Sequence, residues 1–272
     1  MSEILNIDVT KTKKITIDLD AVQERIDMSG GVPTSLVDAF VYMCISDSGM
    51  KEHDFSSNHI WAIVQVAMHC QSAIEFGVRR GISTLAISFG LKESKYESNW
   101  MRSYDIVPTD SHGLNWNSFI PAAKFESVEA EFVLGNSRKV SIPETDLLFI
   151  DTYHSYSHFM EEMRLHSHRA KKYIIMHDSS KTGTFGLVDQ KDGYDQSHDY
   201  RLYEKEGMHN AAMDFASMYK RDWEIFYHDD EGEGLTIFVT RNKSILDNDF
   251  WKHTTPYRLR LERELSEPRS RK

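Results

Sequence analysis

The chain has 272 residues, of which 40% are hydrophobic and 27% charged, and its formal net charge is −10. This composition excludes a wholly disordered chain, because there is ample apolar material for a core. No apolar run approaches the ~18–20 residues that span a membrane, and the N-terminus lacks the layout of a signal peptide. Two cysteines, Cys44 and Cys70, make no disulfide framework, so we expect a cytoplasmic protein.

The charge is unevenly distributed along the chain. Residues 250–272 carry seven Lys or Arg against three Asp or Glu, a net of +4, which leaves −14 on the rest. An acidic body argues against a nucleic-acid-binding protein, whose contact face is basic. We expect the basic end to be a solvated helix, although it could contact an anionic partner. Neither nucleic acid nor a membrane is therefore an expected partner.

The N-terminal segment, residues 1–55, is expected to be largely irregular. We predict a strand over residues 14–19, a helix over 20–28 and another over 34–44, entered after Gly-Gly-Val-Pro. We interpret this segment as a cap on the main domain or as an element for self-association into a homo-oligomer. Its apolar residues could also line an acceptor pocket.

Strands and helices alternate through the main domain, residues 56–243. Helical stretches, such as 82–90 and 155–170, separate brief runs rich in Ile, Val, Leu or Phe. These runs are residues 73–76, SYDIV around Asp105, 131–135, 146–151 and 172–178. Such alternation predicts βαβ crossovers and a mostly parallel sheet. Burial of parallel strands on both faces explains why the runs are apolar throughout.

The last two predicted strands, WEIFYH and GLTIFVTR, are joined by DDEGE. This connection is too short for a helix and predicts an antiparallel hairpin. The predicted fold is therefore α/β: a Rossmann-like doubly wound sheet, mostly parallel with a closing antiparallel strand, plus an N-terminal helical cap. Residues 244–272 are expected to form a basic C-terminal tail.

A glycine turn follows the first strand, in Glu75-Phe76-Gly77-Val78-Arg79-Arg80-Gly81. Ligands of such sheets bind at the carboxyl ends of the strands. Gly77 allows a tight turn, and Gly81 permits close approach of a ligand. Ser83 and Thr84 begin the next helix, where free N–H groups favour a carboxylate. The dinucleotide fingerprint G-x-G-x-x-G is absent, and a purely structural turn is the alternative.

Two further strand ends carry polar residues. A carboxylate at Asp105 can accept hydrogen bonds from both ribose hydroxyls of a nucleotide, or it can serve as a strand-terminal cap. Gly135, Asn136 and Ser137 follow the third strand. Their small polar side chains could meet an adenine edge or simply form a turn.

Two acids end the fourth and fifth strands, Asp151 in FIDTYHSY and Asp178 in IIMHDSS. Neighbouring strand ends place them above one cleft, where two carboxylates repel unless a cation separates them. Mg²⁺ suits one or two carboxylates plus waters and substrate oxygens. The alternative is that one Asp is a cap and the other merely polar.

Histidines surround these acids in the sequence. His154 has an imidazole suited to accept a proton near neutrality if its pKa is unperturbed. We expect His177 to point to the opposite strand face as a buried structural histidine. His154 and His158 have the i, i+4 spacing of a zinc site, but no obvious Glu base accompanies them.

Together these residues resemble class I S-adenosylmethionine-dependent methyltransferases over roughly residues 59–241. The stretch DLLFIDTYHSYSHFMEEMRLHSHRAKKYIIMHDSS is similar to small-molecule O-methyltransferases that include macrocin and cephalosporin-hydroxylase-related proteins. Their hallmark is a strand ending in F-I-D, then H-S-Y, a helix, and a strand ending in H-D. The final strand, EGLTIFVTR, fits the antiparallel seventh strand of this fold.

The resemblance implies a set of site residues. Glu75, Phe76 and Gly77, together with Gly81, would line the methionine end of S-adenosylmethionine, with Ser83 and Thr84 near its carboxylate, Asp105 on the ribose, and Asn136 and Ser137 at the adenine. Asp151 and Asp178 match metal-binding acids of the family. In catechol-type relatives an Asn after the second acid completes the metal site. This chain has Ser179 there, a poorer third ligand, and it has His154 where those relatives have a lysine base.

The expected function is methyl transfer to a hydroxyl of a small molecule or sugar, assisted by Mg²⁺ or another divalent cation. Asp151 would act at the reacting centre and His154 as base. A nicotinamide-dependent oxidoreductase and a non-catalytic cofactor-binding protein are the alternatives, the latter supported by Ser179 in place of Asn. The polar stretch 181–203 is expected to be a substrate lid or a disordered excursion.

Overall fold

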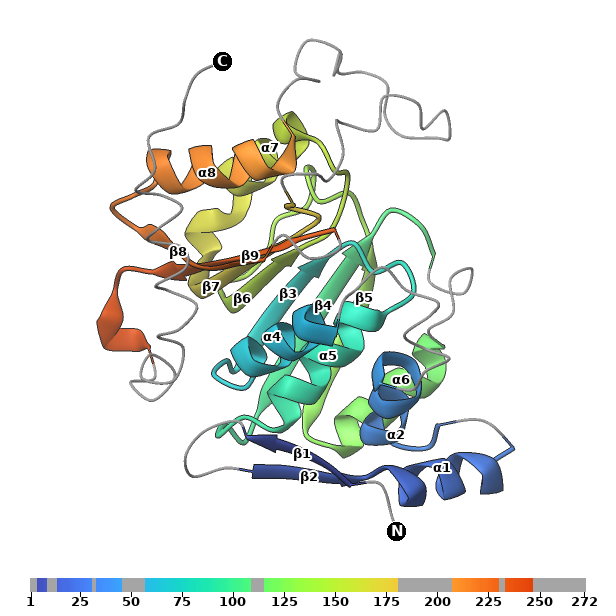
Figure 1. Ribbon diagram of the computed structural model, residues 1–272. Helices are drawn as coiled ribbons and strands as arrows, with labels where there is room; N and C mark the ends of the chain where they lie inside the picture. The colour runs from blue at the N-terminus through green and yellow to red at the C-terminus, as the bar shows by residue number, and fades with distance from the viewer. Residues whose placement is uncertain are drawn as a thin grey trace.

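A seven-stranded mixed sheet forms the middle of the protein in a computed structural model (Figure 1). The structure describes residues 4–8, 14–30, 33–45, 57–108, 115–180, 207–229 and 233–246. The strand order of the sheet is β5-β4-β3-β6-β7-β9-β8. The strands are β3 Ser72–Phe76, β4 Asn99–Asp105, β5 Val128–Leu134, β6 Thr145–Ile150, β7 Ala170–His177, β8 Trp223–Asp229 and β9 Leu235–Thr240. Strands β3 to β7 pair in parallel, while β9 is antiparallel to β7 and β8.

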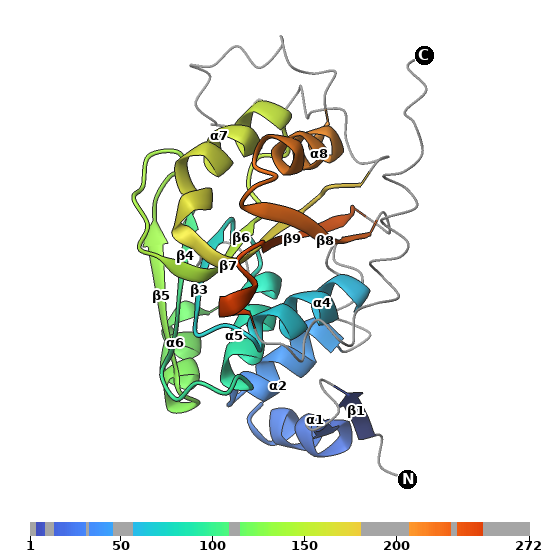
Figure 2. The ribbon, with the colours of Figure 1, turned by 90° about the vertical axis from the view of Figure 1, so that its left-hand side faces the viewer.

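Helices cover both faces of the sheet (Figures 1 and 2). One face carries α4 Ser57–Ala67, α5 Ile82–Lys92 and α6 Trp116–Phe125; the other carries α7 Tyr156–His166, the 3-10 turn Ser167–Arg169 and α8 Met208–Met218. Strand side chains alternate between two cores, so that Phe149 packs toward α4 and α5 while Ile150 packs toward α7 and α8. The predicted Rossmann-like fold is confirmed. No helix of the described residues has the length and hydropathy to cross a bilayer.

Of the strands that the structure describes, the antiparallel β9 comes last in sequence, but it lies one strand in from the edge, between β7 and β8. Because β8 and β7 are both antiparallel to β9, β8 runs in the same direction as the parallel strands. Six strands therefore end at one side of the sheet, which we call the carboxyl edge. A short 3-10 helix, Lys243–Ile245, follows β9.

The N-terminal segment contains more regular structure than the sequence predicts. Strand β1 Ile4–Asp8 pairs with β2 Lys14–Asp18, and α1 Leu19–Met28 follows as predicted. The predicted helix over 34–44 is α2 Leu36–Phe40 continued by a π-helix, Val41–Ile45.

This segment packs on the main domain through an aromatic contact. Phe40 stacks on Phe89 of α5, with ring centroids 4.3 Å apart and an interplanar angle of 7°. Its roles in self-association and in lining a pocket stay predictions. The tail after residue 246 and the stretch 181–203 lie outside the described residues.

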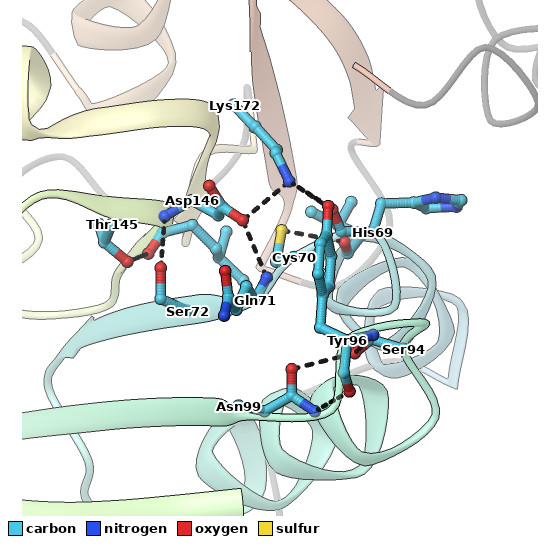
Figure 3. A network of polar contacts seen from close by, with 12 residues as sticks. His69, Cys70, Gln71, Ser72, Ser94, Tyr96, Asn99, Thr145, Asp146 and Lys172 are labelled. Carbon is cyan, nitrogen blue, oxygen red and sulfur yellow. Dashed lines mark hydrogen bonds and ion pairs between the residues drawn. The ribbon is translucent and has the colours of Figure 1, made fainter. Parts of the chain in front are cut away.

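At the edge opposite the carboxyl edge, a partly buried charged network joins the starts of three strands (Figure 3). Lys172 Nζ in β7 donates to Asp146 Oδ2 in β6 at 2.8 Å and to the hydroxyl of Tyr96 at 3.0 Å. The same Asp146 oxygen accepts from the backbone N–H of Gln71, directly before β3, at 2.8 Å. This network fixes the three strands relative to one another far from the predicted site.

Candidate active site

The glycine turn after β3 lies at the carboxyl edge, and its backbone leaves no room for a side chain at Gly77. Gly77 has φ +84°, and a Cβ there would lie 1.8 Å from the backbone oxygen of Asp151. The Asp151 N–H in turn donates to Phe76 O at 2.9 Å. Gly81, with φ +80°, is the N-cap of α5. Both positions favour glycine, and the close approach at Gly77 brings the first acid directly against the turn.

Glu75 is fully buried beneath this turn. Its carboxylate accepts hydrogen bonds from the hydroxyls of Ser83 at 2.6 Å, Thr84 at 2.7 Å and Ser103 at 2.5 Å. Burial raises the pKa of Glu75 to about 7, against the lowering effect of these three hydrogen bonds. Since the Ser83 and Thr84 hydroxyls point at Glu75, a cofactor carboxylate would meet only their backbone N–H groups. The predicted cofactor roles of these residues stay predictions.

Asp105 ends β4 and braces the same turn. Its carboxylate accepts from the backbone N–H groups of Val78 at 2.8 Å, Arg79 at 3.2 Å and Val107 at 3.0 Å. This is the capping arrangement that the sequence left as an alternative. A carboxylate has about four acceptor positions, so a ribose hydroxyl can still donate to it. Ribose binding by Asp105 remains a prediction.

Asn136 and Ser137 form a turn after β5. The Asn136 side chain accepts from the N–H of Arg138 at 2.9 Å. Ser137 is buried, and its carbonyl oxygen lies 2.6 Å from His166 Nε2. The turn is thereby fixed to α7, and the adenine contact predicted for it is not tested.

Asp151 and Asp178 meet at the ends of β6 and β7, as their positions in the sequence predict. His154 lies between them: its Nε2 is 3.1 Å from Asp151 Oδ1 and 2.6 Å from Asp178 Oδ2. All three side chains are at least three-quarters buried, with exposed fractions of 19%, 8% and 24% for Asp151, Asp178 and His154. The predicted base therefore contacts both predicted metal ligands.

His177 corrects one prediction. It is buried as expected, but it faces the acids: Nδ1 lies 3.1 Å from Asp178 Oδ1 and 3.6 Å from Asp151 Oδ2. The reason lies in the backbone, because Asp178 has φ +57°. This left-handed conformation ends the alternation of side chains along the strand, so that consecutive residues converge.

The cluster thus combines two carboxylates with two imidazoles. Burial lowers the pKa of His154, but the two Asp residues outweigh it and raise the value to about 10. They likewise raise the pKa of His177 to about 9, while the histidines hold the pKa of Asp151 well below its usual range. The expectation of an unperturbed His154 is therefore wrong for this arrangement. As a base it must first lose its proton, which a cation bound to the acids would favour.

Ser179, the third expected metal ligand, is engaged elsewhere. Its buried Oγ accepts from the hydroxyl of Thr236 in β9 at 2.8 Å. Asp151, His177 and Asp178 instead each offer a ligand atom, and these atoms lie within 4.8 Å of one another. Among the described residues, none makes a well-aligned hydrogen bond to the buried Asp178 Oδ1. This donor set fits a divalent cation, and its imidazole nitrogen extends the choice from Mg²⁺ to Mn²⁺ and similar ions.

No protein-family model matches the sequence, and no curated protein sequence matches it either. Among solved structures, the chain is similar to an O-methyltransferase from Bacillus cereus in complex with S-adenosylhomocysteine: TM-score 0.50, 15% identity, 81% of this chain and 97% of that chain covered. A methyltransferase from Podospora anserina, also bound to S-adenosylhomocysteine, gives a TM-score of 0.49 at 14% identity, covering 82% of this chain and 97% of that one.

This chain shares a Rossmann-like fold with the Bacillus cereus O-methyltransferase. The antiparallel β9 is the closing strand that the sequence resemblance implies. The fold places the glycine turn, Asp105 and the two acids along one carboxyl edge, where ligands of open α/β sheets bind.

Three residues of the site were not predicted from the sequence: His177, Thr152 and Glu162. The Thr152 hydroxyl donates to both carboxylate oxygens of Glu162, each at 2.9 Å, and His158 Nε2 lies 3.1 Å from one of them. His158 is thus turned to Glu162 and His154 to the acids, so the i, i+4 pair does not form the alternative zinc site. A signal was present, because Glu162 is a charged residue on the apolar face of α7.

Proposed function

We propose that this chain is an S-adenosylmethionine-dependent methyltransferase that methylates a hydroxyl of a small molecule or sugar. The observation that carries this proposal is the contact of His154 with Asp151 and Asp178 beside the glycine turn. A titratable imidazole, two carboxylates and a turn suited to a bound ligand meet at one place. None of these features alone would support methyl transfer.

The cofactor would lie along the carboxyl edge. Its methionine end would rest on the turn from Glu75 to Gly81, with its ribose at Asp105 and its adenine near Asn136 and Ser137. Because Gly77 lies directly against the backbone of Asp151, the methionine end of the cofactor would be adjacent to the acids. The methyl group would then face the acceptor side of the site. Alignment of donor and acceptor in line can supply ~7–11 kcal/mol of the barrier reduction.

Asp151 and Asp178 would hold Mg²⁺ or another divalent cation, with His177 as a third donor in place of Ser179. When bound, the metal supplies Lewis acidity that lowers the pKa of the acceptor hydroxyl. Binding of the cation would also neutralise the negative charge of Asp151 and Asp178, which keeps the proton on His154. His154 Nε2 would then accept the hydroxyl proton as the methyl group is transferred.

The test is production of S-adenosylhomocysteine from S-adenosylmethionine with a panel of phenols, catechols and sugars. We expect at least one acceptor to be methylated, with loss of the activity in EDTA and recovery with Mg²⁺ or Mn²⁺. Asp151→Ala should abolish turnover without unfolding the chain. An undiminished rate in EDTA would remove the metal from the proposal. Cofactor binding with no acceptor methylated would favour the non-catalytic alternative.

A further inference from the structure

We infer that the buried carboxylate of Glu162 is a positioning residue for His154, acting through Thr152 on the loop of residues 152–155. The inference rests on the proposed role of His154 as base. Glu162 touches none of the reacting groups, and its effect would be to hold the loop that carries the imidazole.

One end of the loop is fixed by Glu162. This side chain has 0% exposure, and it accepts the Thr152 hydroxyl at 2.9 Å on each of its two oxygens. His158 Nε2, one turn before Glu162 on α7, lies 3.1 Å from the same carboxylate. A carboxylate withdrawn from water is retained at low cost only when it is satisfied by hydrogen bonds. Here the two partners come from the loop itself and from the helix that follows it.

The other end of the loop is fixed by the helix cap. Ser155 is the N-cap of α7, and its Oγ accepts from the N–H of His158 at 3.3 Å. Its own N–H donates to the carbonyl of Tyr153 at 2.8 Å. His154 therefore stands between two anchored residues, both tied to the first turns of α7.

The start of the loop is constrained from a third side by the sheet. The N–H of Asp151 donates to Phe76 O at 2.9 Å, and Gly77 lies directly against the Asp151 carbonyl. His154 Nε2 must reach Asp151 Oδ1 at 3.1 Å and Asp178 Oδ2 at 2.6 Å at the same time. If Thr152 were not held by Glu162, His154 Nε2 could no longer contact Asp151 and Asp178 at the same time, because a displacement of about an ångström is enough to break one contact.

The test removes the Thr152 hydroxyl while keeping the shape of the side chain. Thr152→Val deletes the donor to Glu162, and Thr152→Ser restores it. Thr145→Val is the matched control: Thr145 begins β6, the strand that Asp151 follows, is 1% exposed, and donates its hydroxyl to Leu147 O at 3.0 Å. It lies at the opposite edge of the sheet from the site.

Two readouts are needed. The first is the imidazole N–H proton resonance of His154, assigned by its loss in His154→Gln. The second is the separate measurement of kcat and of KM for S-adenosylmethionine, with an acceptor that the chain methylates. We expect Thr152→Val to broaden or abolish the resonance and to lower kcat by about tenfold or more, with KM within about twofold. Thr152→Ser should recover both values, and Thr145→Val should leave both unchanged.

The outcomes separate this inference from the proposed function. A wild-type resonance and kcat in Thr152→Val, or equal losses in Thr152→Val and Thr145→Val, would overturn the positioning role while methyl transfer stands. If the wild-type chain methylates no acceptor but its His154 resonance still depends on Thr152, the proposed function fails and the positioning role stands.

Discussion

His154 Nε2 lies 2.6 Å from Asp178 Oδ2, although His154 follows β6 and Asp178 follows β7. This contact joins two strand ends across the carboxyl edge and closes a compact group of two carboxylates and two imidazoles. Because the carboxylates and imidazoles stabilise one another's charges, the group can remain buried. Imidazoles held between carboxylates also suit this group to proton transfer.

The first prediction concerns Asp178. Asp178→Asn should lower methyl transfer by at least about a hundredfold, because a metal ligand and a partner of His154 are lost together. Asn tolerates the left-handed backbone at φ +57°, so the fold should be preserved. The measurement is kcat alongside S-adenosylhomocysteine affinity by calorimetry, with the exposed Asp222→Asn as control. Loss of cofactor affinity equal to the loss of rate would argue against a role confined to the acceptor side.

The second prediction concerns Gly77. A Cβ there would lie 1.8 Å from Asp151 O, so Gly77→Ala should cost at least about 3 kcal/mol of unfolding free energy. Gly30 is the matched control, since it has φ +74° but no atom within 4 Å of its Cβ position. Gly30→Ala should cost only about 1 kcal/mol, from backbone strain alone. Urea unfolding measures both, and equal costs would show that the close approach is unimportant.

The third prediction concerns the pH dependence of stability at Glu75. Its pKa in the fold, about 7, is above the ordinary value of 4.5, so the folded state binds more protons between these two values. The free energy of unfolding should therefore fall as pH rises from about 4.5 to about 7, by on the order of 3 kcal/mol, and level off above. Glu75→Gln should remove this fall. Parallel pH profiles for the variant and the wild type would contradict the assignment.

The fourth prediction compares two neighbouring lysines. Lys172 is 10% exposed and bonded to Asp146, so Lys172→Met should cost about 3 kcal/mol by leaving that carboxylate buried without its cation. Lys171, 51% exposed in its ion pair with Glu144, is the control, and Lys171→Met should leave unfolding free energy essentially unchanged. Neither substitution should alter cofactor affinity, because both lysines begin β7 at the edge opposite the site. Chemical unfolding and calorimetry together check this.

Much of the sheet was predictable because its strands are buried on both faces and read as continuous apolar runs. The meeting of Asp151 and Asp178 followed from the same reasoning, since both end neighbouring parallel strands. Helix α6 was not predicted, because Pro121 lies within it and proline is disfavoured in a helix interior. Strand β1 was missed because it is only five residues long, so its pattern is short.

The site was less predictable where it depends on backbone conformation or distant partners. His177 was expected to point away from the acids because side chains alternate along a strand. That alternation fails at a left-handed residue, and the sequence does not show that Asp178 is one. Glu162 stands out as an acid on the apolar face of α7, but the sequence does not show that Thr152 is its partner. The raised pKa of His154 likewise depends on Asp178, which lies on another strand.

We propose that the turn from Glu75 to Gly81 and Asp105 together hold S-adenosylmethionine. The most direct measurement is calorimetric titration of the intact chain with S-adenosylhomocysteine and, separately, with NAD. We expect saturable binding of S-adenosylhomocysteine at a single site and no binding of NAD. Binding of NAD instead, or of neither ligand, would contradict it.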